Sequence, residues 1–286
     1  MSNKNKAQRR EEARAEALAL QQKQASRDRR NRFIVFGALG VAIAALVVVA
    51  GFILMNEAGK KDVEDIPLAE VADVPAGVTD SGGIPVGSDL VAGTQNDGAP
   101  VVDQYVDYMC PVCGQFEELN AADVETMATE GDATVVFHPV AILDRVSSGT
   151  EYSTRAASAA YWVADQAPDA FFDFNAAMFT NQPEENSPGL DDDEIAAIAQ
   201  EAGVPADVAD GIADGTARGT FGQYAYSLTN EATSDPDLVN SQGTFGTPTI
   251  LVDGERFETW NEPGALLTAV QGGDATAEPS DEASDG

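Results

Sequence analysis

Residues 109–114 read MCPVCG, and they hold the only two cysteines of the 286-residue chain. Two cysteines at this spacing can bind a metal, close a small disulfide loop or exchange electrons with other thiols. Structural zinc needs four ligands, and the chain offers no further cysteine and a single histidine, so we expect no metal here. A disulfide around two intervening residues removes little entropy from the unfolded chain, so it would add little stability. The pattern therefore favours thiol–disulfide exchange.

The sequence around the pair predicts that the cysteines lie where a strand meets a helix. Residues 100–108 have a strand-like composition, whereas residues 113–131 repeat apolar side chains at helical spacing. Cys110 would then lie at the amino terminus of the helix, where free N–H groups and the helix dipole stabilise a thiolate. Pro111 suits the first turn, because its missing N–H has no partner there. We expect Cys110 to be the nucleophile and Cys113 to resolve the mixed disulfide.

Charge is distributed unevenly along the chain. The formal net charge is −32, from 16 Lys and Arg against 48 Asp and Glu. Residues 1–32 carry ten basic and four acidic side chains, a net of +6, whereas residues 56–286 carry six basic and 44 acidic ones, a net of −38. Because so few cations cannot hold a phosphate backbone, we expect no nucleic-acid binding by the acidic part. We interpret its acidity as that of a solvated surface.

Residues 33–55 form a 23-residue stretch without a charge or a proline. This length crosses a bilayer core of about 30 Å and predicts a transmembrane helix. Its length and its basic leader favour an uncleaved anchor over a signal peptide, with processing near Ala50 as the alternative. Six basic residues precede the span within 20 positions and only Lys60 and Lys61 follow it, so we expect residues 1–32 in the cytoplasm and the acidic domain outside. An extracytoplasmic compartment can be oxidising.

Beyond the predicted membrane span, the composition predicts a tether, a mixed α/β domain and an acidic tail. The expected boundaries are 56–79 for the linker, 80–272 for the domain and 273–286 for a disordered tail. Within the domain, β-rich runs at 132–143 and 249–258 flank an Ala-rich helical insertion at about 149–238. The fold class is therefore α/β with an inserted helical region.

Capping and turn residues predict where single elements begin and end. Asp191 or Asp192 can cap a helix that Gly203 would stop. Asp253–Gly254 predicts a tight hairpin turn between two short strands. Asn261 is expected to open the closing helix of the domain.

Two segments resemble a known family when they are taken together. VDQYVDYMCPVCGQFEEL (102–119) resembles the active-site strand and helix of thioredoxin-fold proteins of the DsbA-like, extracytoplasmic branch, and GTFGTPTILVDG (243–254) resembles that fold's Thr-Pro signature. SGGIPVG (81–87) is similar to the short hairpin before the first core strand in related membrane-anchored actinobacterial proteins. The resemblance covers residues 80–272 and implies a thioredoxin fold with an inserted helical domain, preceded by a single transmembrane helix.

The resemblance also implies an activity and its partners. It implies a cis peptide bond before Pro248, which would present the backbone of Thr247 to an extended substrate strand. On the residues alone, a trans proline that opens an edge strand is an equal alternative. The implied protein is a thiol–disulfide oxidoreductase without a cofactor, which oxidises cysteines of secreted or membrane proteins. A quinone-linked membrane protein of the DsbB-like or VKOR-like kind would re-oxidise it.

The residues between the cysteines depart from the family pattern. Many DsbA-type oxidases have a histidine there, and this chain has Pro111 and Val112. The Val112 side chain brings neither a charge nor a donor, so we expect a less depressed Cys110 pKa and a milder oxidant.

Nearby polar residues also differ from the family pattern. Gln104 stands where thioredoxin-like proteins have a buried acid, six residues before the first cysteine, with Asp103 beside it. We interpret Asp107 as a surface carboxylate, although it could instead repel the thiolate or relay a proton. His138 is expected to be a core or strand-end histidine rather than a catalytic one.

Two other functions stay open at this point. The same fold could act as a reductase or isomerase, because the direction of electron flow depends on the reduction potential and the partner. The chain could also be a chaperone-like binding module whose helical region holds unfolded chains and whose disulfide is not catalytic.

Overall fold

The structure is a computed structural model that describes residues 63–240 and 242–272. The predicted basic segment 1–32, transmembrane helix 33–55 and acidic tail 273–286 lie outside the described residues. Within the described ranges, no helix has both the length and the apolar character needed to cross a membrane.

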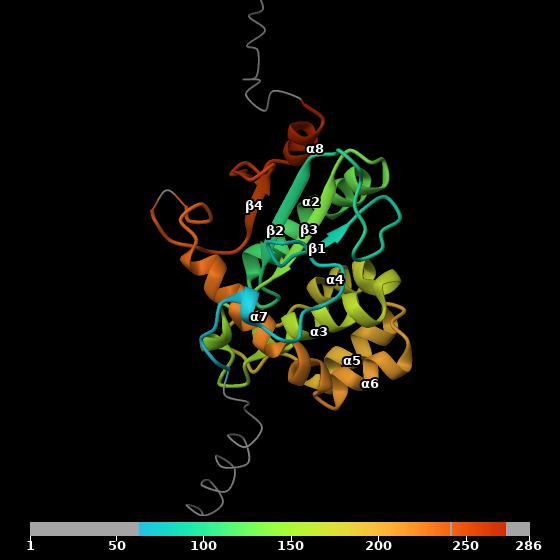
Figure 1. Ribbon diagram of the computed structural model, residues 1–286, viewed down its shortest axis with the longest axis vertical. Helices are drawn as coiled ribbons and strands as arrows, with labels where there is room; N and C mark the ends of the chain where they lie inside the picture. Colours follow the sequence, from blue (N-terminus) through green and yellow to red (C-terminus); the bar gives the residue numbers. More distant parts are fainter. Residues whose placement is uncertain (1–62, 241, 273–286) are drawn as a thin grey trace, which may run out of the picture. The chain divides into compact units, whose positions relative to one another are not determined.

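A five-stranded sheet forms the centre of the domain, in the order β1-β3-β2-β4-β5 (Figure 1). The strands are β1 (Ile84–Val86), β2 (Val101–Val106), β3 (Thr134–Pro139), β4 (Thr249–Val252) and β5 (Glu255–Arg256). β2 and β3 pair in parallel, and the other neighbours are antiparallel. A parallel pair needs a crossover connection, and here the crossover contains helix α2.

Most of the remaining chain is helical. The helices are η1 (Leu68–Glu70), α2 (Pro111–Thr129), η2 (Asp144–Val146), α3 (Tyr152–Gln166), η3 (Pro168–Ala170), α4 (Phe171–Thr180), α5 (Asp192–Glu201), α6 (Ala206–Ala213), α7 (Thr216–Ser234) and α8 (Ala265–Val270). The helices from α3 to α7 form the predicted insertion between β3 and β4, and in Figure 1 they gather below the sheet. This confirms an α/β core with an inserted helical region.

The register of the sheet brings two distant loops together. In β2, Tyr105 pairs with His138 of β3 on one side and with Thr249 of β4 on the other. β2 therefore ends beside the point where β4 begins. The loop after β2, residues 107–110, must lie next to the residues just before Thr249.

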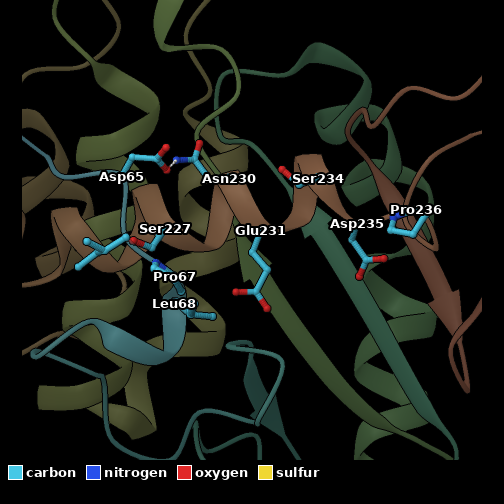
Figure 2. Close-up of a pocket in the computed structure, with 10 residues that line it drawn as sticks. Asp65, Pro67, Leu68, Ser227, Asn230, Glu231, Ser234, Asp235 and Pro236 are labelled. Atoms are coloured by element: carbon cyan, nitrogen blue, oxygen red, sulfur yellow. Dashed lines mark hydrogen bonds between the residues drawn. The ribbon is translucent and has the colours of Figure 1, made fainter.

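The predicted linker boundary at residue 80 is too late. Residues 63–79 belong to the folded unit, with Leu68 and Val71 buried in its core. The segment runs along α7, and Asn230 donates a 3.3 Å hydrogen bond to Asp65 (Figure 2). A groove of about 510 Å³ lies between this segment and α7. The apolar residues of the segment lack a periodic pattern, which is why the composition suggested a tether.

The predicted start of the closing helix is also wrong. α8 begins at Ala265, after Gly264 in a left-handed conformation with φ of 74°, and not after Asn261. Pro263 explains the difference, because a proline disfavours helical geometry in the residue before it. Residues 81–87 contain β1, which pairs with β3 at the edge of the sheet and also, through Val86, with Ala92 in an antiparallel bridge.

The cap of α5 is confirmed as the sequence predicted it. Asp191 accepts a 2.8 Å hydrogen bond from the Glu194 N–H, and the Glu194 carboxylate accepts one from the Asp191 N–H. These reciprocal bonds form a capping box.

Replacement of Asp191 tests the capping box. We expect Asp191→Ala to lower the free energy of unfolding by about 1 kcal/mol, because the cap acceptor is lost. Asp193→Ala removes an equal charge from the same turn but no cap, and should cost only about 0.3 kcal/mol. Urea denaturation measures both values, and equal losses would contradict a specific role for the cap.

Candidate active site

Cys110 lies at the junction of β2 and α2, as the sequence predicted. It is the N-cap residue of α2, with an extended backbone, and Pro111 is the first helical residue. The Cys110 carbonyl accepts hydrogen bonds from the N–H groups of Cys113 and Gly114, at 3.0 and 3.2 Å. Cys110 therefore directly precedes the first turn of α2, whose N–H groups have no partner within the helix.

The second signature lies directly beside this cysteine. The Thr247–Pro248 peptide bond is cis, as the resemblance implied. The Cys110 thiol donates a 3.3 Å hydrogen bond to the Thr247 carbonyl. Because β2 ends beside the start of β4, residues 137 positions apart in the chain make this contact.

The two cysteines have opposite acidities. The Cys113 thiol, as a hydrogen-bond donor to the Cys110 sulfur, is the main reason that the pKa of Cys110 falls from 9.0 to about 6. A contact with Thr247 and the backbone N–H groups of Cys113 and Val112 lower this pKa further, while burial opposes them. Burial and the neighbouring Cys110 raise the pKa of Cys113 well above its usual value.

The two cysteines also differ in their exposure to solvent. Both cysteines are free thiols, and Cys110 is 6% exposed whereas Cys113 is completely buried. A low pKa and an accessible sulfur identify the attacking thiol, so the expected roles of nucleophile and resolving cysteine fit the geometry. Val112 also contributes more than the sequence suggested, because its backbone N–H points at the Cys110 sulfur even though its side chain has no donor.

The interpretation of Asp107 as a surface carboxylate is wrong. Asp107 is completely buried, and its carboxylate accepts hydrogen bonds from the Met109 N–H, the Leu143 N–H and the Ser153 hydroxyl at 2.8–3.0 Å. Burial raises its pKa to about 7, although these bonds oppose the shift. Asp107 therefore ties the turn that carries the cysteines to the loop after β3 and to α3.

Gln182, which follows α4, is a further contact to this turn that the sequence did not reveal. Its side-chain amide donates to the carbonyls of Tyr108 and Cys110, at 3.1 and 2.9 Å. Gly114 leaves room for it, because a Cβ at that position would lie 2.5 Å from the Gln182 Oε1. No sequence pattern connects Gln182 with the cysteines, which lie about 70 residues earlier.

His138 is a core histidine, as expected. It is completely buried in β3, its Nε2 lies 2.8 Å from the Asp103 carboxylate, and the Tyr105 ring stacks on it at 4.0 Å. Gln104 is also buried, at the position where related proteins have an acid. In the part of the chain that the structure describes, no three His, Cys, Asp or Glu side chains gather as metal ligands would.

Known proteins resemble this chain in sequence and in fold. A family model described as Thioredoxin matches residues 87–271. The reduced DsbA from Mycobacterium tuberculosis is 32% identical, over 68% of this chain and 94% of that one, with a TM-score of 0.53. The thiol-disulfide oxidoreductase MdbA from Actinomyces oris is 23% identical, over 72% of this chain and 95% of that one, with a TM-score of 0.55, which supports the fold alone.

A curated relative matches a smaller part of a longer protein. The serine/threonine-protein kinase PknE of Mycobacterium tuberculosis is 30% identical over 173 residues, which are 59% of this chain and 29% of the kinase. The chain therefore spans less than a third of the length of the curated relatives that it matches.

The family match covers more than half of the chain, and the chain belongs to the thioredoxin family. Within it, the inserted helical region, the cysteine pair and the similarity to a DsbA define a DsbA-like thiol–disulfide oxidoreductase. Cys110 and Cys113 are its redox pair.

The different acidities predict how the reduced protein reacts with an alkylating reagent. We expect iodoacetamide to modify Cys110 with a rate that rises through a midpoint near pH 6, because the thiolate predominates above its pKa. Cys113→Ala should move this midpoint upward, because the donor to the Cys110 sulfur is lost. Mass spectrometry across a pH series measures both. A midpoint near pH 9 in the unaltered protein would contradict the stabilised thiolate.

The buried bonds of Asp107 predict its effect on stability. Asp107→Ala leaves two backbone N–H groups and one hydroxyl without their acceptor, so we expect the free energy of unfolding to fall by about 2–4 kcal/mol. Ser153→Ala removes only one of these bonds and should cost about 1 kcal/mol. Urea denaturation of the reduced proteins compares them, and a loss below 1 kcal/mol for Asp107→Ala would refute the structural role.

Proposed function

We propose that the protein oxidises cysteine pairs of secreted or membrane polypeptides outside the cytoplasmic membrane. The observation that carries this proposal is the stabilised Cys110 thiolate, whose pKa is about 6. A group that stabilises the thiolate stabilises the reduced pair relative to the disulfide, and so makes the disulfide a better oxidant. The strongly oxidising DsbA has a thiolate pKa of about 3.5. A milder oxidant than that enzyme is therefore expected.

The reaction would proceed in two exchanges. A substrate thiolate attacks the Cys110 sulfur of the disulfide, the bond between the two cysteines breaks, and Cys113 leaves as a thiolate that takes up a proton. The buried position of Cys113 and its high pKa favour that protonation. A second substrate thiolate then attacks the substrate sulfur of the mixed disulfide, and Cys110 leaves as a stable thiolate. Two electrons pass from the substrate to the cysteine pair.

Thr247 and Pro248 would position the substrate. The Thr247 carbonyl lies 3.3 Å from the Cys110 sulfur, so a peptide joined to that sulfur passes along residues 247–248. An extended peptide there can pair with the backbone of Thr247, as an added strand pairs with a sheet edge. Pro111 and Val112, the other residues of the motif, border the sulfur from α2.

The sequence supports a location for the protein, and the family supports a kind of re-oxidising partner. Residues 33–55 would anchor the protein, with its amino terminus in the cytoplasm and the redox domain outside. A quinone-linked membrane protein of the DsbB-like or VKOR-like kind would accept the two electrons and restore the disulfide. The reaction requires no bound cofactor, because the two sulfurs carry the electrons.

The alternatives differ from this proposal in measurable ways. A reductase or isomerase of the same fold would be kept as a dithiol in the cell, whereas an oxidase is kept as a disulfide. A chaperone-like binding module with a non-catalytic disulfide would form no mixed disulfides with its clients. The low pKa of Cys110 favours a reactive cysteine over a non-catalytic disulfide, and the redox state of the pair in the cell separates the oxidase from the reductase or isomerase.

Two measurements on the whole protein test the proposal. We expect a reduction potential between about −270 mV, the value for thioredoxin, and about −120 mV, the value for DsbA, in glutathione equilibrium. In cells, Cys113→Ala should accumulate reductant-sensitive mixed disulfides with secreted proteins, because the resolving sulfur is missing. The control is Cys110→Ala in combination with Cys113→Ala, which should trap none. A potential below that of thioredoxin, or a mostly dithiol form in the cell, would refute the oxidase.

A further inference from the structure

The Thr247 side chain carries a polar atom that has no partner in the folded chain. Its Oγ1 is buried, and among the described residues no hydrogen bond reaches it. A buried hydroxyl in this condition costs free energy, because it has lost its hydrogen bonds to water. At a redox site, such an atom can have its partner in another charge state of the reacting groups.

The backbone around Thr247 fixes where this hydroxyl lies. The Thr247 carbonyl accepts the 3.3 Å hydrogen bond from the Cys110 thiol. Two residues later β4 begins at Thr249, whose hydroxyl donates a 2.7 Å hydrogen bond back to the Gly246 carbonyl. The Thr247 side chain is among the groups that lower the pKa of both Cys110 and Cys113. The hydroxyl is therefore held close to both sulfurs.

The charge on the sulfurs decides whether the hydroxyl has a partner. In the dithiol form, the Cys110 thiol directs its hydrogen at the Thr247 carbonyl, and a neutral thiol is only a weak acceptor. A thiolate has no hydrogen to donate and accepts charge-assisted hydrogen bonds. The Thr247 hydroxyl can turn about its Cβ–Oγ1 bond and donate to the charged sulfur. A donor that gains its partner only when charge develops stabilises the charged state selectively.

We propose that the Thr247 hydroxyl is a catalytic group that donates a hydrogen bond to each sulfur of the pair in turn, as that sulfur becomes a thiolate. In the first exchange, the bond between the cysteines breaks and its electron pair leaves with the Cys113 sulfur, which accepts from the hydroxyl. In the second exchange, the mixed disulfide breaks and the electron pair leaves with the Cys110 sulfur, which accepts next. Thr247 keeps its proton in both steps. This role rests on the proposed exchange reaction and holds for either direction of electron flow.

Replacement of the hydroxyl by a methyl group tests the role at Cys110. Thr247→Val keeps the branched side chain and removes the donor, so we expect the midpoint of Cys110 alkylation to move from near pH 6 to about pH 7, a tenfold loss of thiolate stability. Thr247→Ser retains the donor and should keep the midpoint near pH 6. Mass spectrometry of the reduced proteins across a pH series measures the midpoints, and equal midpoints for the two variants would overturn the role.

The stability of the reduced protein separates this role from a packing role. The lowered pKa of Cys110 stabilises the folded protein only where the thiolate is present, and this contribution is lost as the pH falls through about 6. Thr247→Val should therefore leave the unfolding equilibrium constant unchanged at pH 5 and raise it about tenfold at pH 8. Urea denaturation at the two pH values measures this, and an equal loss of stability at both would overturn the role.

Reduction of the disulfide tests the role at Cys113. We expect dithiothreitol to reduce the disulfide of Thr247→Val about three- to tenfold more slowly than that of the unaltered protein, because the leaving Cys113 thiolate has lost a donor. The control is Thr244→Val, which removes a hydroxyl from the same loop that donates to Asn240, and which should react at the unaltered rate. Rapid acid quenching and mass spectrometry measure the rates. An equal rate for Thr247→Val and the unaltered protein would overturn the role.

The outcomes separate the role of the hydroxyl from the oxidase itself. An alkylation midpoint that stays near pH 6 in Thr247→Val would overturn the role of the hydroxyl and leave the proposed function intact. A mostly dithiol form in the cell, together with a midpoint that moves to about pH 7 in Thr247→Val, would refute the oxidase and still support the role of the hydroxyl.

Discussion

The pairing of β2 with β4 is the constraint on which the redox site depends. It places the end of one central strand beside the start of the next, so the Cys110 thiol meets the Thr247 carbonyl at 3.3 Å. The helix that begins at Pro111 then directs its free N–H groups at the same sulfur. The Cys110 sulfur is therefore contacted by two kinds of group. The Thr247 carbonyl accepts a hydrogen bond from its thiol form, and the N–H groups of α2 stabilise its thiolate form. The sheet supplies the first and the helix supplies the second.

The inserted helical region is part of this site and not an appendage to it. Ser153 of α3 donates to the buried Asp107, and Gln182, after α4, donates to the carbonyls of Tyr108 and Cys110. The turn between β2 and α2 is therefore held from the sheet side and from the helical side. The insertion therefore helps to fix the backbone of the turn that carries Cys110.

The sequence predicted those features that local patterns encode. The cysteine spacing, the Asp191 cap and the Thr-Pro dipeptide each occupy a short segment, and each lies where expected. The sequence did not predict the features that depend on packing between distant segments. A single aspartate in the sequence gives no sign of burial, and only the fold brings Leu143 and Ser153 against the Asp107 carboxylate. Gln182 could not be identified either, because its contacts join residues more than 70 positions apart.

The complete burial of Cys113 limits how many chains the protein can hold at once. A polypeptide bulky enough to be a client can form a covalent link only with Cys110, which is 6% exposed, since Cys113 is completely buried. Occupancy is therefore restricted to a single chain, and two clients cannot be joined through this protein by accident. The same enclosure shields Cys113 from peroxide, so irreversible oxidative damage would fall first on Cys110, whose thiolate is the more reactive.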